Sequence, residues 1–185
     1  MMAFQPIVDT ITGRVSAYEA LVRGRGGEGA GAVLARVTPE TRYAFDQQCR
    51  VAAIEQAVAA GILDTGARLS INFMPNAVYS PVACIQLTLK TARKCGFPPE
   101  RLQFEFTEQE ELDVPHVAKI IETYRMMGFK TALDDFGAGH AGLGLLARFT
   151  PDVIKLDREL IAGIDASLSR RLIVESVLRM AEGLD

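Results

Sequence analysis

The feature that most restricts the fold of this chain is a regular alternation of short apolar segments with longer amphipathic ones. Segments rich in β-branched and aromatic residues predict strands, and the segments between them, several of which end at glycine, predict helices. Alternation of this kind is typical of a parallel sheet covered by helices. The predicted strands are 4–8, 15–22, 67–73, 102–108, 131–135 and 152–157, and the predicted helices are 43–60, 82–95, 114–127, 143–148 and 168–181.

The first long helix has clear boundary signals. Thr38 followed by Pro39 is typical of a helix start, with the hydroxyl as cap and the proline in the first turn, and Gly61 is placed to end the helix. Helical spacing then predicts which side chains face the core. These are Phe45, Cys49, Ala52, Ala53 and Ala57.

A glycine-rich segment, 24–31, precedes this helix and could be mistaken for a phosphate-binding loop. No Gly-Lys-Ser or Gly-Lys-Thr follows it, and its context is not strand, loop and helix. We therefore expect a connecting loop.

Composition narrows the class of protein. A chain of 185 residues suits one domain with a sizeable core, and the net charge of −3 argues against duplex nucleic acid as a ligand. The longest apolar runs are too short to span a bilayer, and the first residues do not form a signal peptide. Three cysteines without metal spacing and two histidines argue against zinc and fit reduced thiols. We expect a cytoplasmic protein.

Polar side chains recur where the predicted strands end. In a (β/α) barrel the carboxyl ends of the strands build the active site, whereas in a doubly wound sheet the site lies at one crevice. Polar groups after several separate strands therefore favour a barrel. These residues are Glu19, Asn72, Glu105, Asp134, Asp135 and Lys155.

Asp134 and Asp135 carry the strongest chemical signal. Two adjacent carboxylates at the end of an apolar strand repel each other unless a cation or water reaches both. Glycines follow them and let the backbone approach a ligand closely. We predict a hard divalent metal here, with Lys155 nearby, a combination that suits phosphate chemistry. Taken singly, Glu105 also fits a solvated or capping acid, and Lys155 a structural ion pair.

Asp135-Phe136-Gly137 also matches the metal motif of protein kinases. That alternative requires a Gly-rich loop on a strand, a lysine strand soon after it, and a His-Arg-Asp loop before the motif. The sequence contains none of these in that order, so we reject the kinase interpretation.

Several ordered motifs together resemble the EAL-domain family, the cyclic-di-GMP phosphodiesterases. Glu19-Ala20-Leu21 is the signature itself, and later segments are similar to the later motifs of the family in the same order. These segments are 4–8, 70–72, 105–108, 133–139 and 153–157. Segments 45–49 and 139–143 are most similar to EAL domains attached to blue-light-sensing BLUF domains.

The resemblance implies a two-metal site. Glu19, Asn72, Glu105 and Asp134 would bind one divalent cation, and Asp135 would bind a second and bridge the pair with Asp134. Oxygen ligands of this kind suit Mg²⁺ or Mn²⁺. We expect Ca²⁺ to occupy the site without supporting hydrolysis, because it is larger and holds its ligands less rigidly.

The resemblance also implies catalytic and binding roles. We expect Asp135, Lys155 and Glu108 to act in catalysis, with Lys155 at the attacking water or its phosphate. Glu108 would not touch metal but would hold the loop after Asp135 in place, and Arg23 would contact a phosphate. The implied reaction hydrolyses one phosphodiester bond of cyclic di-GMP and gives linear pGpG.

The end of the chain departs from the family pattern. A (β/α)₈ barrel usually takes roughly 250 residues, and this chain stops after the helix that follows the Lys155 strand. We expect residues 1–185 to form an EAL-type barrel that lacks its last two strand–helix units and the catalytic glutamate they carry. The chain would then be a piece of a longer protein or be completed by a partner, and would be far less active alone.

Two other functions stay open. The domain could be a receptor that binds cyclic di-GMP without hydrolysing it, or a regulatory domain that forms a homodimer through the region after Asp135. Every ligand that the resemblance implies within this chain is present. That favours the enzyme, with cyclic di-GMP and a second copy of the chain as partners.

Overall fold

A curled six-stranded sheet lies at the centre of the described part of the computed structural model, which covers residues 1–107, 113–139 and 142–184. The strands follow one another across the sheet in chain order. They are β1 (Met2–Val8), β2 (Val15–Val22), β3 (Arg68–Asn72), β4 (Leu102–Thr107), β5 (Lys130–Phe136) and β6 (Val153–Leu156).

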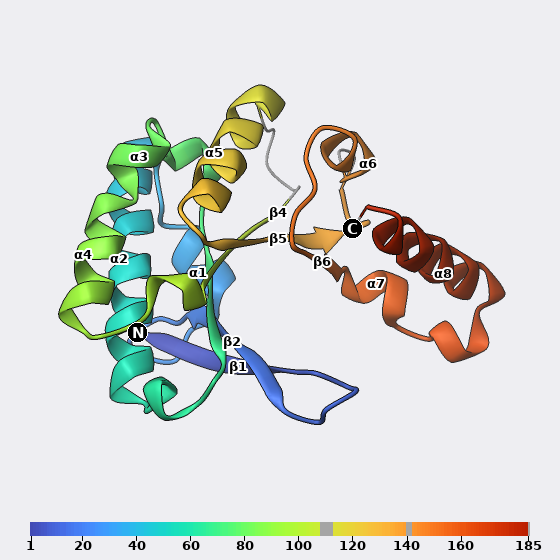
Figure 1. Ribbon diagram of the computed structural model, residues 1–185, viewed down its shortest axis with the longest axis horizontal. Helices are drawn as coiled ribbons and strands as arrows, with labels where there is room; N and C mark the ends of the chain where they lie inside the picture. The colour runs from blue at the N-terminus through green and yellow to red at the C-terminus, as the bar shows by residue number, and fades with distance from the viewer. Residues whose placement is uncertain (108–112, 140–141, 185) are drawn as a thin grey trace.

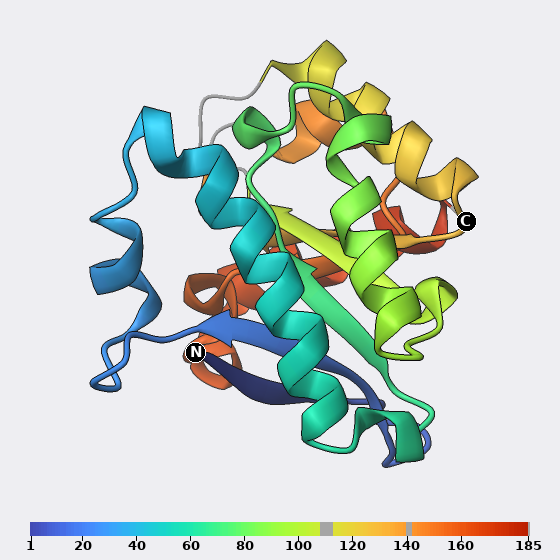
Figure 2. The ribbon, with the colours of Figure 1, turned by 90° about the vertical axis from the view of Figure 1, so that its left-hand side faces the viewer.

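The helices connect these strands. The α-helices are α1 (Ala30–Leu34), α2 (Pro39–Ala59), α3 (Pro81–Cys84), α4 (Gln86–Lys94), α5 (Val114–Met126), α6 (Gly142–Leu146), α7 (Arg158–Ile161) and α8 (Leu168–Glu182). Short 3₁₀ helices are η1 (Ile62–Asp64), η2 (Pro75–Ala77), η3 (Pro99–Arg101) and η4 (Ile164–Ala166). Helices α2, α4 and α5 cover one face of the sheet (Figure 1), and α2 and α4 lie side by side across it (Figure 2).

The sheet is parallel from β2 to β6, but β1 pairs with β2 in antiparallel orientation. The prediction of a parallel sheet is therefore wrong for the first strand. A short turn joins β1 and β2, and only antiparallel strands can be joined so closely. In that turn the Asp9 carboxylate accepts hydrogen bonds of 2.8 Å from the backbone N–H groups of Ile11 and Thr12, and Gly13 has a φ of +68°.

The predicted (β/α) barrel is confirmed at the level of a mixed α/β fold with a curled sheet of strand–helix units. That two further units are missing stays a prediction. The predicted helix 82–95 is interrupted, because Ile85 ends α3 and begins α4. The short helices α1 and α7 were not predicted.

The N-terminus of α2 follows the predicted signals, since Thr38 caps it in a capping box and proline follows in the first turn. The predicted inner face is only partly correct. Ala53 and Ala57 are buried, but Phe45, Cys49 and Ala52 are half-buried. The buried positions are instead shared with polar side chains, namely Asp46, Gln47 and Arg50.

An aromatic cluster fills the space between the sheet and its helices. Phe104 of β4 lies 4.8 Å from Tyr124 of α5 and 5.3 Å from Phe129, measured between ring centroids. Phe73 packs against the rings of Phe104 and Tyr124. Side chains alternate along β4, since Phe104 and Phe106 join this core while Gln103 and Glu105 bond to each other on the other face.

A buried ion pair lies inside this aromatic cluster. The Arg50 guanidinium is fully buried, and its Nε lies 2.7 Å from the Asp46 carboxylate. It donates a hydrogen bond of 2.9 Å to the Tyr124 hydroxyl and lies over the rings of Phe73 and Phe104. Arginine suits such a place because its planar guanidinium stacks on aromatic rings and donates hydrogen bonds within its own plane.

We expect Tyr124→Phe to lower the free energy of unfolding by about 1–3 kcal/mol, because it leaves a buried Arg50 N–H without its acceptor. Urea denaturation measures the change. Tyr79→Phe is the matched control, since Tyr79 is exposed and should change stability by less than about 0.5 kcal/mol. Equal losses in both variants would show that the Arg50 contact does not stabilise the core.

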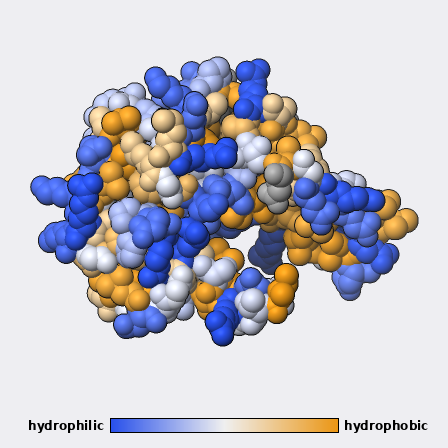
Figure 3. Space-filling model, viewed as in Figure 1, coloured by the Kyte–Doolittle hydropathy of each residue, from blue (hydrophilic) through white to orange (hydrophobic). Residues whose placement is uncertain are grey.

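Helix α8 packs through few residues. Val174 is its buried residue, whereas several of its apolar side chains are exposed (Figure 3). These are Leu168, Leu172, Ile173 and Leu178. Within the described ranges, no helix has the length and apolar character needed to cross a membrane.

Candidate functional site

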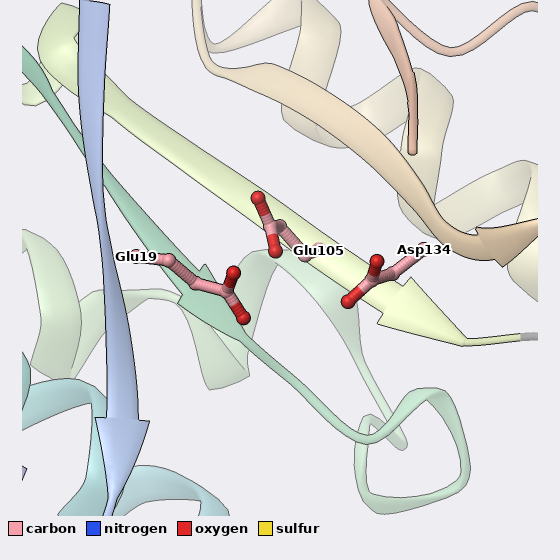
Figure 4. Close-up of side chains that lie close together, drawn as sticks. All are labelled: Glu19, Glu105 and Asp134. Atoms are coloured by element: carbon pink, nitrogen blue, oxygen red, sulfur yellow. The ribbon is translucent and has the colours of Figure 1, made fainter. Parts of the chain in front are cut away.

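Three carboxylates from three strands converge at one edge of the sheet. Glu19 lies on β2, Glu105 on β4 and Asp134 on β5, and their side chains point toward one another (Figure 4). One oxygen of each lies within 4.8 Å of the others. This spacing would allow all three to share one cation.

Lys155 of β6 reaches the same point. Its ammonium Nζ lies 2.7 Å from Glu105 Oε2, 2.9 Å from Glu19 Oε2 and 3.0 Å from Asp134 Oδ2. Burial alone would lower the pKa of Lys155, but these carboxylates, Glu105 foremost, more than offset it, so its pKa is raised and the side chain stays charged.

Glu105 is the most deeply placed of the three acids. Its side chain is fully buried, and burial raises the pKa of its carboxyl above the ordinary value against the opposing effect of Lys155. The charge of Glu19 raises it further. At Glu105 the attraction of Lys155 is larger than the repulsion from Glu19, and the pKa stays raised because burial is the largest effect.

Asn72 lies beside Glu19 at the end of β3. Its side-chain amide Nδ2 donates a hydrogen bond of 3.0 Å to Glu19 Oε1. The register places Asn72 opposite Glu105 on the neighbouring strand. The Asn72 amide thus lies beside the carboxylates, and its role as a metal ligand stays a prediction.

The backbone at Asp135 explains how two adjacent acids reach one site. In a regular strand their side chains would point to opposite faces. Asp135 has a φ of +53°, a left-handed conformation that aspartate tolerates better than most residues, and the pairing of β5 with β6 is irregular between Leu133 and Phe136. Such irregularities redirect side chains, and both Asp134 and Asp135 line the same cavity.

The turn continues at Gly137, which has a φ of +99°. A Cβ there would lie 2.4 Å from the Leu160 side chain of α7. The left-handed φ therefore favours glycine at this turn, and the close approach of the backbone to a ligand stays a prediction.

A cavity of about 300 Å³ opens beside the carboxylates. Glu19, Asn72, Asp134 and Asp135 line one part of it. The rest of the wall is largely apolar and comes from β2, α1, α2 and the segment after β3; it includes Leu21, Leu34, Phe45, Phe73, Met74 and Pro75. Apolar walls with a few convergent polar groups are typical of small-molecule sites.

The donor set fits a hard divalent cation. All the candidate ligands are oxygens, the type that Mg²⁺ and Mn²⁺ prefer. The carboxylates of Glu19, Glu105, Asp134 and Asp135 outnumber the ammonium of Lys155 around which they gather. Burial and the charge of Asp134 raise the pKa of Asp135 as well, so the group carries negative charge that a cation would offset.

Most of the predicted site residues are brought together, and one lies apart. Arg23 is half-buried just after β2, and its guanidinium Nη1 donates a hydrogen bond of 2.9 Å to the Val22 carbonyl. Val22 lines the cavity. Glu108 lies outside the described residues, so its predicted role at the loop after Asp135 stays a prediction, as does dimerisation through that region.

Sequence reasoning assigned no role to three residues that support the site. The side chains of Ser70 and Gln103 donate hydrogen bonds to Glu105 Oε1. Asp46 accepts a hydrogen bond of 2.9 Å from the backbone N–H of Met74 at the cavity wall. Signals for two of them exist in the sequence. Gln103 stands two residues before Glu105, the spacing of side chains on one face of a strand, and Asp46 stands four residues before Arg50, the spacing of a helical ion pair.

Comparison with known proteins gives one family and close relatives. The family model described as EAL domain matches residues 1–185. The chain is 30% identical over 184 residues to the blue light- and temperature-regulated antirepressor BluF of Escherichia coli, covering 99% of this chain and 45% of that protein. It is also 30% identical over 196 residues to the probable cyclic di-GMP phosphodiesterase PdeN of Escherichia coli, covering 100% of this chain and 36% of that protein. The chain thus spans less than half of these curated relatives.

Two solved structures share the fold. A standalone versatile EAL protein from Vibrio cholerae O395, in its c-di-GMP-bound form, is 47% identical with a TM-score of 0.93, covering 100% of this chain and 77% of that one. BlrP1 of Klebsiella pneumoniae, in a complex with manganese and cyclic di-GMP, is 35% identical with a TM-score of 0.88, covering 99% of this chain and 46% of that one. BlrP1 is also known in a complex with calcium and the dinucleotide.

Proposed function

The chain belongs to the EAL domain family, and from this premise we propose that it carries the metal-dependent site of a phosphodiesterase that hydrolyses cyclic di-GMP to linear pGpG. The observation that carries the proposal is the convergence of Glu19, Glu105 and Asp134 around the ammonium of Lys155 at the carboxyl ends of the strands. Charge of both signs is thereby placed beside a cavity that suits a small molecule.

The cations would be held by Glu19, Asn72, Glu105, Asp134 and Asp135, with Asp134 and Asp135 shared between two ions. When bound, divalent cations would supply activation of the attacking water and stabilisation of charge on the phosphate and the leaving oxygen. The chain's own task would be to hold these oxygens in place, and the five residues come from four neighbouring strands, β2, β3, β4 and β5.

Lys155 provides the positive charge that belongs to the protein itself. Its raised pKa keeps it protonated near neutral pH, so it can donate a hydrogen bond to water or to a phosphate oxygen. Such a preorganised donor stabilises charge that builds up in the transition state. Lys155 is therefore proposed as a catalytic residue.

The cavity beside the carboxylates would take one end of the dinucleotide. Its apolar wall suits the flat surface of a nucleobase, and the polar edge at Glu19 and Asp135 would lie next to a phosphate across the cations. Arg23, which follows a cavity residue, would contact a second phosphate.

The test of this proposal is direct. The 185-residue chain, and an extended domain that joins it to the part of the Vibrio cholerae chain that it does not cover, are incubated with cyclic di-GMP and Mn²⁺, and chromatography detects pGpG. Formation of pGpG by the extended domain supports the enzyme. Binding of cyclic di-GMP without pGpG in either protein would favour a receptor instead.

We expect Ca²⁺ to support hydrolysis at least about tenfold more slowly than Mg²⁺ or Mn²⁺ in the extended domain. Ca²⁺ takes more ligands at longer distances and in a less rigid geometry, so the water and phosphate would be held less well. Initial rates at saturating concentrations of each ion give the comparison, with chelator-treated protein as the blank. Similar rates with Ca²⁺ and Mn²⁺ would contradict a rigid two-metal site.

A further inference from the structure

The carboxylates of the site share a pattern in how their oxygens are used. Glu19 and Asp134 each turn one oxygen toward Lys155 and give the other to a neighbouring donor. For Glu19 that donor is the amide of Asn72, at 3.0 Å, and for Asp134 it is the backbone N–H of Asp135, at 2.9 Å. Each acid thus has one oxygen held by a neighbouring donor and the other directed to the point between the carboxylates where Lys155 Nζ lies, the shared centre of the site.

Glu105 follows the pattern with two donors in place of one. Its Oε2 lies 2.7 Å from Lys155 Nζ, while its Oε1 accepts hydrogen bonds from the Ser70 hydroxyl and, at 3.1 Å, from the Gln103 amide. Both donors are side chains. They lie two residues nearer the amino ends of β3 and β4 than Asn72 and Glu105, on the inner face of the curled sheet.

Ser70 and Gln103 form a linked pair. They lie opposite each other in the register of β3 and β4, and both are buried. The Gln103 amide donates to the Ser70 hydroxyl at 2.9 Å as well as to Glu105. Because the hydroxyl oxygen already accepts from Gln103, its own hydrogen is directed to Glu105 Oε1.

This arrangement decides which oxygen Glu105 can offer. A fully buried carboxylate oxygen needs a donor, and losing one is costly. With Ser70 and Gln103 in place, Oε1 is satisfied and the carboxylate plane is held, so Oε2 alone faces the centre between Glu19 and Asp134. Without them the carboxylate would turn to recover a donor, and Oε2 would leave the shared position.

We infer that Ser70 and Gln103 are positioning residues that hold Glu105 with a single oxygen directed at the metal site. The inference rests on the proposed metal site, but it concerns metal affinity and not the reaction. Partners that orient a metal-binding carboxylate typically change metal affinity by about 10–100-fold when they are lost.

The experiment measures Mn²⁺ binding to the 185-residue chain by calorimetry. We expect the double variant Ser70→Ala/Gln103→Met to bind Mn²⁺ about 10–100-fold more weakly than the unmodified chain, with each single variant in between. Ser70→Thr keeps the hydroxyl on a strand, where β-branched residues are favoured, and should bind within about threefold.

Thr131→Val is the matched control. Thr131 is a buried strand residue whose hydroxyl also donates to a carboxylate, Asp152, at 3.2 Å, but outside the site. It should lose stability in urea and keep its Mn²⁺ affinity. If Thr131→Val weakens Mn²⁺ binding as much as Ser70→Ala, or if the double variant binds like the unmodified chain, the positioning role is wrong.

The outcomes also separate this inference from the proposed reaction. A chain that binds Mn²⁺ in the predicted order of variants, while the extended domain makes no pGpG, would support the positioning role and overturn the enzyme. An unmodified chain that binds no Mn²⁺ would overturn the positioning role.

Discussion

The Lys155→Ala variant of the extended domain is expected to turn over cyclic di-GMP at least about a hundredfold more slowly, the loss typical of one preorganised electrostatic group. The ammonium lies within 3.0 Å of three carboxylates, and in the proposed reaction it would donate to the phosphate or to the attacking water. In the proposed reaction it would stabilise charge that appears only in the transition state. The chemical step should therefore suffer more than binding of the substrate.

Binding separates this role from simple attraction of the substrate. With Ca²⁺ present to slow hydrolysis, the affinity of Lys155→Ala for cyclic di-GMP should change by less than about tenfold, or about 1.4 kcal/mol. Lys130→Ala is the matched control, because Lys130 also pairs with a carboxylate, Asp152, away from the site. It should keep its turnover within about twofold.

Lys155→Ala should also affect Mn²⁺ affinity, and in the opposite direction to turnover. A divalent cation bound at the proposed site would compete with Lys155 for the oxygens of Glu19, Glu105 and Asp134. Removing the ammonium should leave Mn²⁺ affinity equal or higher while turnover falls. If Lys155→Ala instead abolishes dinucleotide binding and the residual complex turns over normally, the lysine only binds substrate and the catalytic role is wrong.

The fold and most of the site could be predicted from the sequence because both depend on local patterns. The order of residues alone indicates helix starts such as Thr38-Pro39. It also places four polar residues at predicted strand ends, namely Glu19, Glu105, Asp134 and Lys155. The family resemblance is confirmed by the EAL domain model over residues 1–185. The likeness to blue-light-linked EAL domains is confirmed by the match to the blue light-regulated BluF.

What could not be predicted depends on contacts across the sheet. Strand β1 is antiparallel because a short turn joins it to β2, and the alternation of strand and helix segments in the sequence does not indicate this. The Asp135 side chain is redirected by a left-handed backbone conformation within β5. The support of Glu105 by Ser70 requires the register of β3 against β4. On α2, Arg50 is buried at a position where an apolar residue would be expected. Its burial depends on the Tyr124 hydroxyl, which comes from α5, far away in the sequence.

The Glu105→Gln variant of the 185-residue chain is expected to bind Mn²⁺ at least about a thousandfold more weakly. Glu105 is fully buried and its Oε2 faces the centre of the site, so its charge acts through a medium much less screening than water. A unit charge pair 4 Å apart is worth about 4 kcal/mol at an effective dielectric constant of 20, which corresponds to about a thousandfold in affinity.

The fold should survive this substitution. Because burial raises the pKa of Glu105 in the folded protein above its unfolded value, its ionised form costs stability, and any stability that it contributes is lost as the pH rises through the folded pKa. Glutamine keeps the shape without the charge, so the free energy of unfolding in chelator should change by less than about 1 kcal/mol.

Asp152→Asn should behave in the opposite way and serves as the matched control. Lys130 and the Thr131 hydrogen bonds outweigh burial and lower the pKa of Asp152, so its charge stabilises the fold above the unfolded pKa and this contribution disappears as the pH falls. At pH 7 the variant should lose about 1 kcal/mol in urea and bind Mn²⁺ normally. If Glu105→Gln binds Mn²⁺ within about tenfold of the unmodified chain, or loses affinity only as far as it unfolds, Glu105 is a structural acid and the metal site lies elsewhere.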